Sequence, residues 1–219
     1  MKSPFVVALT GASGAVYGAR LLEVLLAAGE RLHLVVSPAA NEVMRAELGV
    51  VAREPSQLEE LFAAAREAMG DPRDSPLVDI PTLSSLVTWH AHGDYAASIA
   101  SGSYLTRGMV ICPCSMDTLA SVAHGLGTNL VHRAAAVHLK ERRPLVLVPR
   151  ETPLGSIQLA NMTRLAEAGA IILPAMPGFY HRPESIGELI DFVVARICDQ
   201  LGVRHELSRR WGDGQSSAG

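Results

Sequence analysis

Short runs of apolar residues recur along the chain, and each is followed by a segment with apolar residues at helical spacing. Runs of four to six apolar residues between polar clusters indicate strands that are buried on both faces of a sheet. The predicted strands are 5–10, 32–36, 109–113, 144–149 and 170–174. The predicted helices are 17–28, 38–48, 57–69, 115–123, 130–140, 157–168 and 183–201.

The regular alternation of these elements predicts the fold class. Strand, helix, strand and helix in succession are typical of an α/β protein with a doubly wound parallel sheet and right-handed crossovers. The pattern is less clear between residues 50 and 94, where helix 57–69 reads as exposed, and no linker is long enough to divide the chain. We expect a single domain over residues 1–203 and a polar tail over 204–219, loosely ordered or in contact with a partner.

Composition narrows the class of protein. The net charge of −3 argues against nucleic acid as the main partner, and no apolar run has the length needed to span a membrane. The chain leads directly into a strand, so we expect no signal peptide. Cys112 and Cys114 would share one face of a strand, and together with Cys198 they do not have the spacing of a zinc site. Buried, unreactive thiols in the reducing cytoplasm are the better interpretation.

The turn after the first strand is made of small residues, Gly11-Ala12-Ser13-Gly14. Such a turn between a strand and a helix exposes backbone N–H groups to an anion, and glycine permits close approach. Its spacing is neither the G-x-G-x-x-G dinucleotide fingerprint nor a P-loop, and Ser37 stands where a dinucleotide site needs an acid. The pattern therefore favours flavin mononucleotide (FMN) over NAD.

A second turn of this kind, 113–118, also follows a strand, and Ser115 is suited to cap the next helix. By itself it is an ordinary helix cap, but two turns at one sheet edge favour a shared ligand. Arg150 and Glu151 follow the apolar run 144–149 and are predicted to lie at the same edge. They are either an ordinary surface ion pair or part of a reactive site.

At this point the chain resembles the UbiX-type flavin prenyltransferases. The resemblance extends from about Phe5 to Val203 and is carried by 11–15, 101–103, 112–115, 140–153 and 177–183. It implies a flavodoxin-like Rossmann fold and a homo-oligomer, commonly a dodecamer. It also implies transfer of a dimethylallyl group from dimethylallyl monophosphate to reduced FMN. The product, prenylated FMN, is the cofactor of UbiD-type decarboxylases, including the one in ubiquinone biosynthesis.

The resemblance also assigns roles to individual residues. The flavin contacts fall on Gly11, Ala12, Ser13, Ser37, Ser115, Met116, Asp117, Thr118 and Arg150. The prenyl substrate contacts fall on Trp89, Arg133, Lys140, Tyr180 and Arg196. The residues of the chemical step fall on Ser13, Glu47 and Glu151, with Lys140 assisting.

Physical chemistry is consistent with these roles. Arg133 and Lys140 are seven residues apart and share a helix face, and with Arg196 they would suit a departing phosphate. Aromatic faces at Trp89 and Tyr180 would stabilise an allylic cation. Glu151 would act as acid toward the phosphate or as base in ring closure. Ordinary alternatives are a solvated helix face for the cations and core packing for the aromatic residues.

Other functions remain open at this level. An FMN-dependent cysteine decarboxylase would use similar flavin turns, but segment 159–162 lacks the proline pattern of its substrate loop. A non-enzymatic flavin carrier would not need Arg133, Lys140, Arg196 and Glu151 together. The reaction requires no metal, and we expect His90 and His92 to lie at a surface or an interface.

Overall fold

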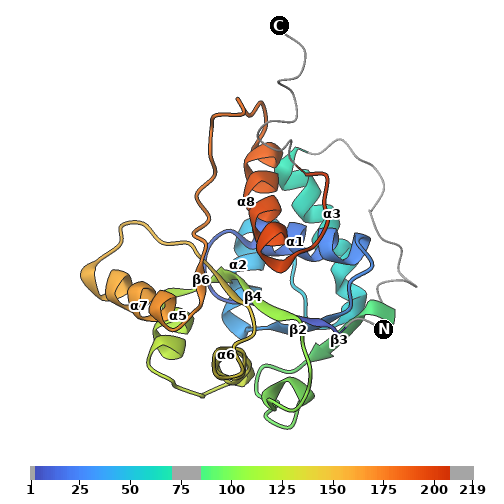
Figure 1. The fold of residues 1–219 in the computed structure, drawn as a ribbon. Coiled ribbons are helices and arrows are strands. Elements are labelled where there is room, and N and C mark those ends of the chain that lie inside the picture. The colour runs from blue at the N-terminus through green and yellow to red at the C-terminus, as the bar shows by residue number, and fades with distance from the viewer. Residues whose placement is uncertain (1–2, 71–84, 208–219) are drawn as a thin grey trace, which may run out of the picture.

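A six-stranded parallel sheet forms the centre of the computed structural model, which describes residues 3–70 and 85–207. Its order is β3-β2-β1-β4-β5-β6 (Figure 1). The strands are β1 (Phe5–Leu9), β2 (Leu32–Val36), β3 (Val87–His90), β4 (Gly108–Cys114), β5 (Leu145–Pro149) and β6 (Ile171–Ile172). The chain proceeds outward from β1 in one direction, then returns to β4 and proceeds in the other, which confirms the predicted doubly wound topology.

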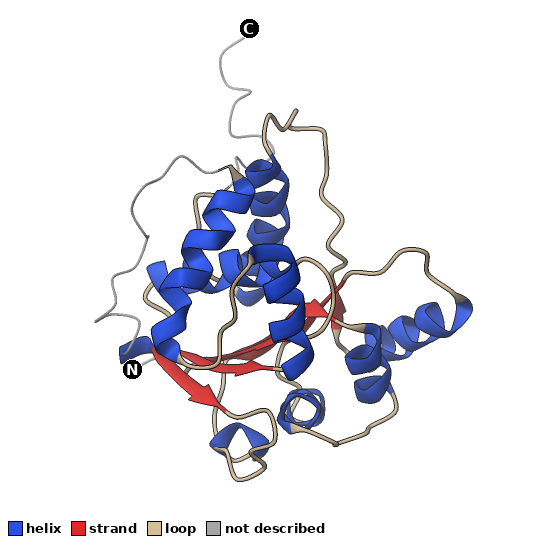
Figure 2. Ribbon diagram, turned by 180° about the vertical axis from the view of Figure 1, so that it is seen from behind, coloured by secondary structure: helices blue, strands red, loops and turns tan. Residues whose placement is uncertain are grey.

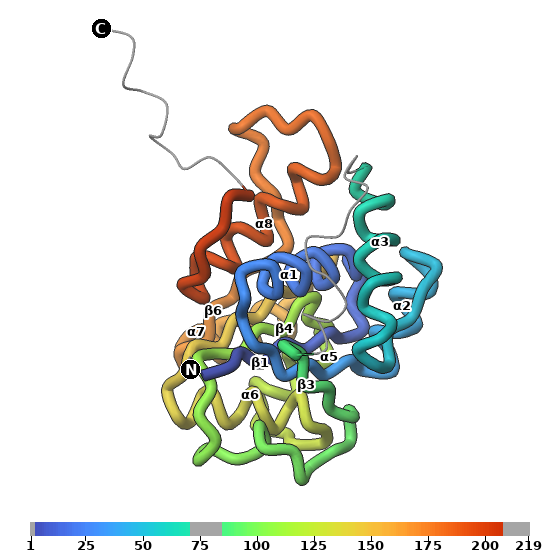
Figure 3. The backbone as a smooth tube through the Cα atoms, turned by 90° about the vertical axis from the view of Figure 1, so that its right-hand side faces the viewer, coloured from blue at the N-terminus to red at the C-terminus, as the bar shows by residue number. Residues whose placement is uncertain are grey.

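Helices cover both faces of the sheet (Figures 2 and 3). One face carries α1 (Ala15–Ala27), α2 (Pro38–Leu48), α3 (Leu58–Met69) and α8 (Ile186–Leu201). The other carries α5 (Met116–Ala123), α6 (Leu130–Lys140) and α7 (Ser156–Glu167). In the described ranges no helix is long and apolar enough to cross a membrane.

The buried strands explain why this arrangement forms. Along β1, Phe5, Val7 and Leu9 belong to the core under α1 and α8, whereas Val6 and Ala8 belong to the core under α5 and α6. All five residues of β1 are buried. A strand that must bury both of its faces requires helices on both sides of the sheet, so the continuous apolar runs correctly predicted this architecture.

Two sequence-based expectations are wrong, and one strand was missed. Helix α3 is not exposed, because Leu58, Leu61 and Phe62 are buried in the core. Strand β3 was not predicted, because it is an edge strand in which Val87 alone is buried. Cys112 and Cys114 contact opposite core clusters, because the register between β4 and β5 shifts between Ile111 and Cys114.

The three cysteines are free thiols, and burial raises the pKa of each of them. Segment 203–207 also returns to the body of the protein, since Val203 is buried and Leu207 packs against the core beside α8. The rest of the predicted tail lies outside the described residues, and the domain boundary at 203 stays a prediction.

A buried ionic network joins three helices on the face that carries α1. Arg20 of α1 donates from Nε to Asp191 of α8 at 2.7 Å and from an Nη to Glu23 at 2.9 Å. Arg66 of α3 donates to the other Glu23 oxygen at 2.6 Å. Buried charges are tolerated only when they are paired in this way, so the network fixes how α1, α3 and α8 pack together.

We predict that Glu23→Gln destabilises the protein by about 3 to 5 kcal/mol, because it leaves two buried arginines without their shared carboxylate. Urea unfolding of the protein measures the change. Glu42→Gln is the control, since it breaks an exposed ion pair with Arg45 and should cost less than about 1 kcal/mol. Equal effects of the two substitutions would contradict the prediction.

Candidate active site

Four strands end at the same edge of the sheet and bring four distant segments together. The turn after β1, Ser37 after β2, Ser115 after β4 and Arg150 after β5 all follow carboxyl ends of adjacent parallel strands. The direction of the chain reverses between β1 and β4, and this is where open α/β sheets bind ligands.

The small-residue turn between β1 and α1 is tightly packed. A Cβ atom at Gly11 would lie 2.5 Å from the Cβ of Ala39 at the start of α2, so glycine is needed there. Arg150 reaches this turn from the end of β5 and donates from Nε to the Ser13 carbonyl at 3.3 Å. The structure therefore brings together Gly11, Ser13 and Arg150, three of the predicted flavin contacts.

Glu47 occupies the amino end of α1. Its carboxylate accepts hydrogen bonds from the Gly14 N–H at 2.9 Å and from the Ala15 N–H at 2.8 Å. An anion at this position is favoured by the helix dipole and by the unpaired N–H groups. The expectation that the whole turn leaves its N–H groups open to a phosphate is thus wrong for Gly14 and Ala15, because a side chain from α2 already binds them.

The turn between β4 and α5 is held by hydroxyl groups. Ser115 Oγ caps α5 by accepting from the Thr118 N–H at 3.2 Å, and it donates to Thr118 Oγ1 at 3.0 Å. The Ser115 N–H donates to Thr10 Oγ1 at 2.8 Å, which ties this turn to the end of β1. Ser37 similarly caps α2 by accepting from the Ala40 N–H, a bond that does not use its hydroxyl hydrogen. The predicted residues Met116 and Asp117 form the first turn of α5.

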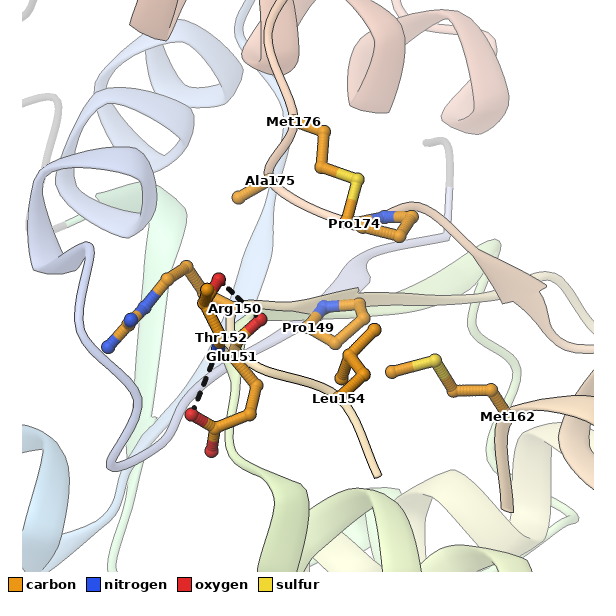
Figure 4. A pocket seen from close by; sticks show the side chains of 9 residues that line it. All are labelled: Pro149, Arg150, Glu151, Thr152, Leu154, Met162, Pro174, Ala175 and Met176. Atoms are coloured by element: carbon orange, nitrogen blue, oxygen red, sulfur yellow. Dashed lines mark hydrogen bonds between the residues drawn. The ribbon is translucent and has the colours of Figure 1, made fainter. Parts of the chain in front are cut away.

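Arg150 and Glu151 line a small cavity of about 50 Å³ with Met162, Pro174 and Met176, and their side chains extend in different directions (Figure 4). Glu151 is exposed and its Oε1 accepts from the Thr152 N–H at 3.1 Å. Among the described residues they form no ion pair with each other, so the surface-pair interpretation is wrong. Glu151 is therefore available to a ligand that approaches this edge.

A larger cleft of about 470 Å³ lies at the ends of β2 and β3. Trp89, His90 and His92 line it from the β3 side, and Pro38 and Asn41 line it from α2. Behind it, His90 Nε2 lies 2.6 Å from His33 Nδ1, and His33 Nε2 lies 2.8 Å from the Tyr104 hydroxyl. Burial and the neighbouring His90 lower the pKa of His33 to about 4. The two predicted histidines therefore line a cleft.

The three predicted phosphate-binding cations do not meet within one chain. Arg133 and Lys140 lie on α6, under one face of the sheet, whereas Arg196 lies on α8, over the other face (Figure 1). Lys140 also precedes the amino end of β5, so it lies at the sheet edge opposite to Arg150. The predicted Tyr180 is 68% exposed in the loop before α8, where its ring contacts Phe192.

Two contributors to this site were missed at the sequence level. Thr10 links the two turns, and Ala39 makes Gly11 necessary. In the sequence, these two residues could be recognised only from where they stand. Thr10 ends a predicted strand, and Ala39 follows Ser37-Pro38.

Comparison with known proteins decides the family. A family model described as Flavoprotein matches residues 1–198. The flavin prenyltransferase UbiX of Halalkalibacterium halodurans is 47% identical over 213 residues, which cover 97% of this chain and 95% of the relative. The chain belongs to the UbiX family of flavin prenyltransferases.

Solved UbiX-family structures share the fold over nearly their whole length. AnUbiX (PadA1), solved in complex with FMN and dimethylallyl pyrophosphate, has a TM-score of 0.79 and 37% identity, with 96% of this chain and 98% of that chain covered. A dodecameric FMN-dependent UbiX-like decarboxylase from Escherichia coli O157:H7 has a TM-score of 0.76 and 39% identity, with 94% and 97% covered. These matches confirm the predicted family and fold class.

We predict that the free energy of unfolding falls by roughly 2 kcal/mol between pH 6.5 and 5 because of His33. A histidine whose pKa is lowered to about 4 by folding binds more protons in the unfolded state over this range, so acid favours unfolding. Urea titrations at several pH values measure the slope. His33→Gln should flatten it, whereas replacing the exposed His181 should not; equal slopes for wild type and His33→Gln would contradict the prediction.

Proposed function

We propose that this chain transfers the dimethylallyl group of dimethylallyl monophosphate to N5 and C6 of reduced FMN and releases prenylated FMN. The observation that carries the proposal is similarity to UbiX flavin prenyltransferases over nearly the whole chain, together with the two turns that meet at one sheet edge. Membership in that family also disfavours the alternative functions, a cysteine decarboxylase or a flavin carrier.

The residues at the sheet edge are suited to hold FMN. Glycine at position 11 permits close backbone approach, and Arg150 adds a positive charge beside the Ser13 carbonyl. Glu47 binds the Gly14 and Ala15 N–H groups, and the Ala12 N–H donates to the Thr10 carbonyl at 2.9 Å. The donors that remain for a flavin therefore include those of Ser13, the Ser37 hydroxyl and the α5 turn. We assign flavin binding to Gly11, Ala12, Ser13, Ser37, Arg150 and residues 115–118.

The prenyl phosphate site requires more than one copy of the chain. The sheet separates Arg133 and Lys140 on α6 from Arg196 on α8, yet a phosphate dianion needs several cations within contact distance. A homo-oligomer resolves this conflict, because one copy can supply α6 and another α8. The exposed apolar side chains on α7 and around α8, Ile157, Leu159, Phe179 and Ile186, are consistent with assembly, and we propose a dodecamer.

In this arrangement each residue has a distinct task. Arg133, Lys140 and Arg196 stabilise the negative charge of the departing phosphate, and Tyr180 and Trp89 stabilise the positive charge of the allyl group. Glu151 donates a proton to the phosphate or accepts one in ring closure. Ser13 and Glu47 handle protons at N5 and on the flavin ring.

The product would serve a UbiD-type decarboxylase. Free, buried cysteines with raised pKa values are compatible with a reducing compartment, and we place the reaction in the cytoplasm.

The decisive experiment mixes the protein anaerobically with reduced FMN and dimethylallyl monophosphate and measures the flavin by mass spectrometry. We expect the mass of prenylated FMN. Loss of CO₂ from a cysteine-terminated peptide, with the FMN mass unchanged, would support a cysteine decarboxylase instead. Bound but unmodified FMN in both assays would indicate a carrier.

We predict that Glu151→Gln lowers turnover by about 10²-fold to 10³-fold with little change in FMN affinity, because it removes the proton-transfer group and keeps the shape. Single-turnover assays measure the rate, and flavin fluorescence measures binding. Full turnover in this variant would remove the proposed role of Glu151.

We predict that Gly11→Ala weakens FMN binding by about tenfold or more, because the added methyl group collides with Ala39 and moves α2 away from the turn. Equilibrium titration with FMN measures the dissociation constant. Gly127→Ala is the matched control, since nothing lies within 4 Å of its added Cβ. Unchanged affinity in Gly11→Ala would place FMN away from this turn.

A further inference from the structure

Arg196 does not stand alone on α8, because a fixed carboxylate lies beside it. Arg196 donates from an Nη to Asp199 Oδ2 at 2.9 Å, three residues further along the helix. The other oxygen, Asp199 Oδ1, lies 3.2 Å from His205 Nε2. The Asp199 carboxylate is thus held on both sides, by a guanidinium and by an imidazole.

The chain turns back on itself to supply that imidazole. Helix α8 ends at Leu201, the next residue Gly202 has a positive φ of 65°, and the residues after it return along the helix. The His205 side chain is only 3% exposed, although the sequence predicted that the tail from residue 204 is loosely ordered or in contact with a partner. A buried histidine cannot move freely, so it restrains the carboxylate that it contacts.

The hydrogen bonds also define which nitrogen of His205 faces the acid. The Leu207 N–H donates to His205 Nδ1 at 3.4 Å, so Nδ1 acts as an acceptor. In the neutral ring the proton therefore resides on Nε2, which donates to Asp199 Oδ1. Arg196 and His205 both act as donors toward the Asp199 carboxylate in this arrangement.

This fixed negative charge constrains any phosphate that binds Arg196. Asp199 occupies one edge of the guanidinium, so a ligand must use the other N–H groups, within a few ångströms of the carboxylate. A monophosphate fits one free edge of the arginine. A diphosphate brings a second phosphoryl group, and therefore more negative charge, close to the Asp199 carboxylate. Like charges within a few ångströms of each other repel.

We propose that Asp199, held by His205, is a specificity-determining residue that favours prenyl monophosphates over prenyl diphosphates. The inference rests on the proposed function, in which Arg196 binds the prenyl phosphate. Both kinds of prenyl donor are relevant to the family, since AnUbiX was solved with dimethylallyl pyrophosphate. Asp199 acts through charge and through the position of Arg196, and it does not take part in bond breaking.

The test compares kcat/KM for dimethylallyl monophosphate and dimethylallyl diphosphate in the full-length protein with reduced FMN. We expect the wild type to prefer the monophosphate and Asp199→Asn to reduce that preference about threefold to fivefold, mainly through KM, because the charge is partly screened by solvent. Asp199→Glu retains the charge and should retain the preference. A loss of packing alone would affect both substrates equally.

A matched control removes a carboxylate from the first turn of the same helix. Glu188→Gln makes the same change in charge 11 residues away, about 16 Å along α8, and should leave the substrate ratio unchanged. An unchanged ratio in Asp199→Asn, or equal ratios for Asp199→Asn and Asp199→Glu, would overturn the inference. Failure of the wild type to prenylate FMN from either donor would instead overturn the proposed function.

Discussion

The parallel direction of the strands is the constraint on which the candidate site depends. Because β1, β2, β4 and β5 all end at one edge, four segments that are far apart in the sequence meet there. The contact from Arg150 Nε to the Ser13 carbonyl spans 137 positions of sequence, and the contact from the Ser115 N–H to Thr10 spans 105. Neither contact would form in an antiparallel arrangement of the same elements.

The charged groups of the candidate site are paired or kept apart within one chain. Within one chain, internal partners hold the charged groups: Glu47 binds the amino end of α1, and Asp199 binds Arg196. The cations on α6 and the cation on α8 lie on opposite faces of the sheet. Under the proposed function, a pocket for a phosphate dianion therefore depends on assembly.

Sequence reasoning succeeded where the physical signal was local. Burial of both strand faces predicted the sheet, Ser37 and Ser115 cap helices as expected, and the small residues 11–14 form the turn after β1. It failed at β3, whose edge position leaves only Val87 buried, and at α3, whose mixed composition concealed its buried stripe. The predicted flavin residues Ser13, Ser115 and Arg150 lie at one sheet edge, whereas Lys140 lies at the opposite edge, and the roles of all of them stay predictions.

The sequence alone therefore determined the order and type of most elements, the doubly wound sheet and the residues that follow each strand, because periodicity and capping act over a few residues. Only the tertiary structure decided that Glu47 occupies the α1 terminus, that Cys112 and Cys114 face opposite cores, and that a buried His205 restrains Asp199. These facts depend on strand register and on how the chain returns to α8, and no local pattern encodes a contact between segments that meet only after folding.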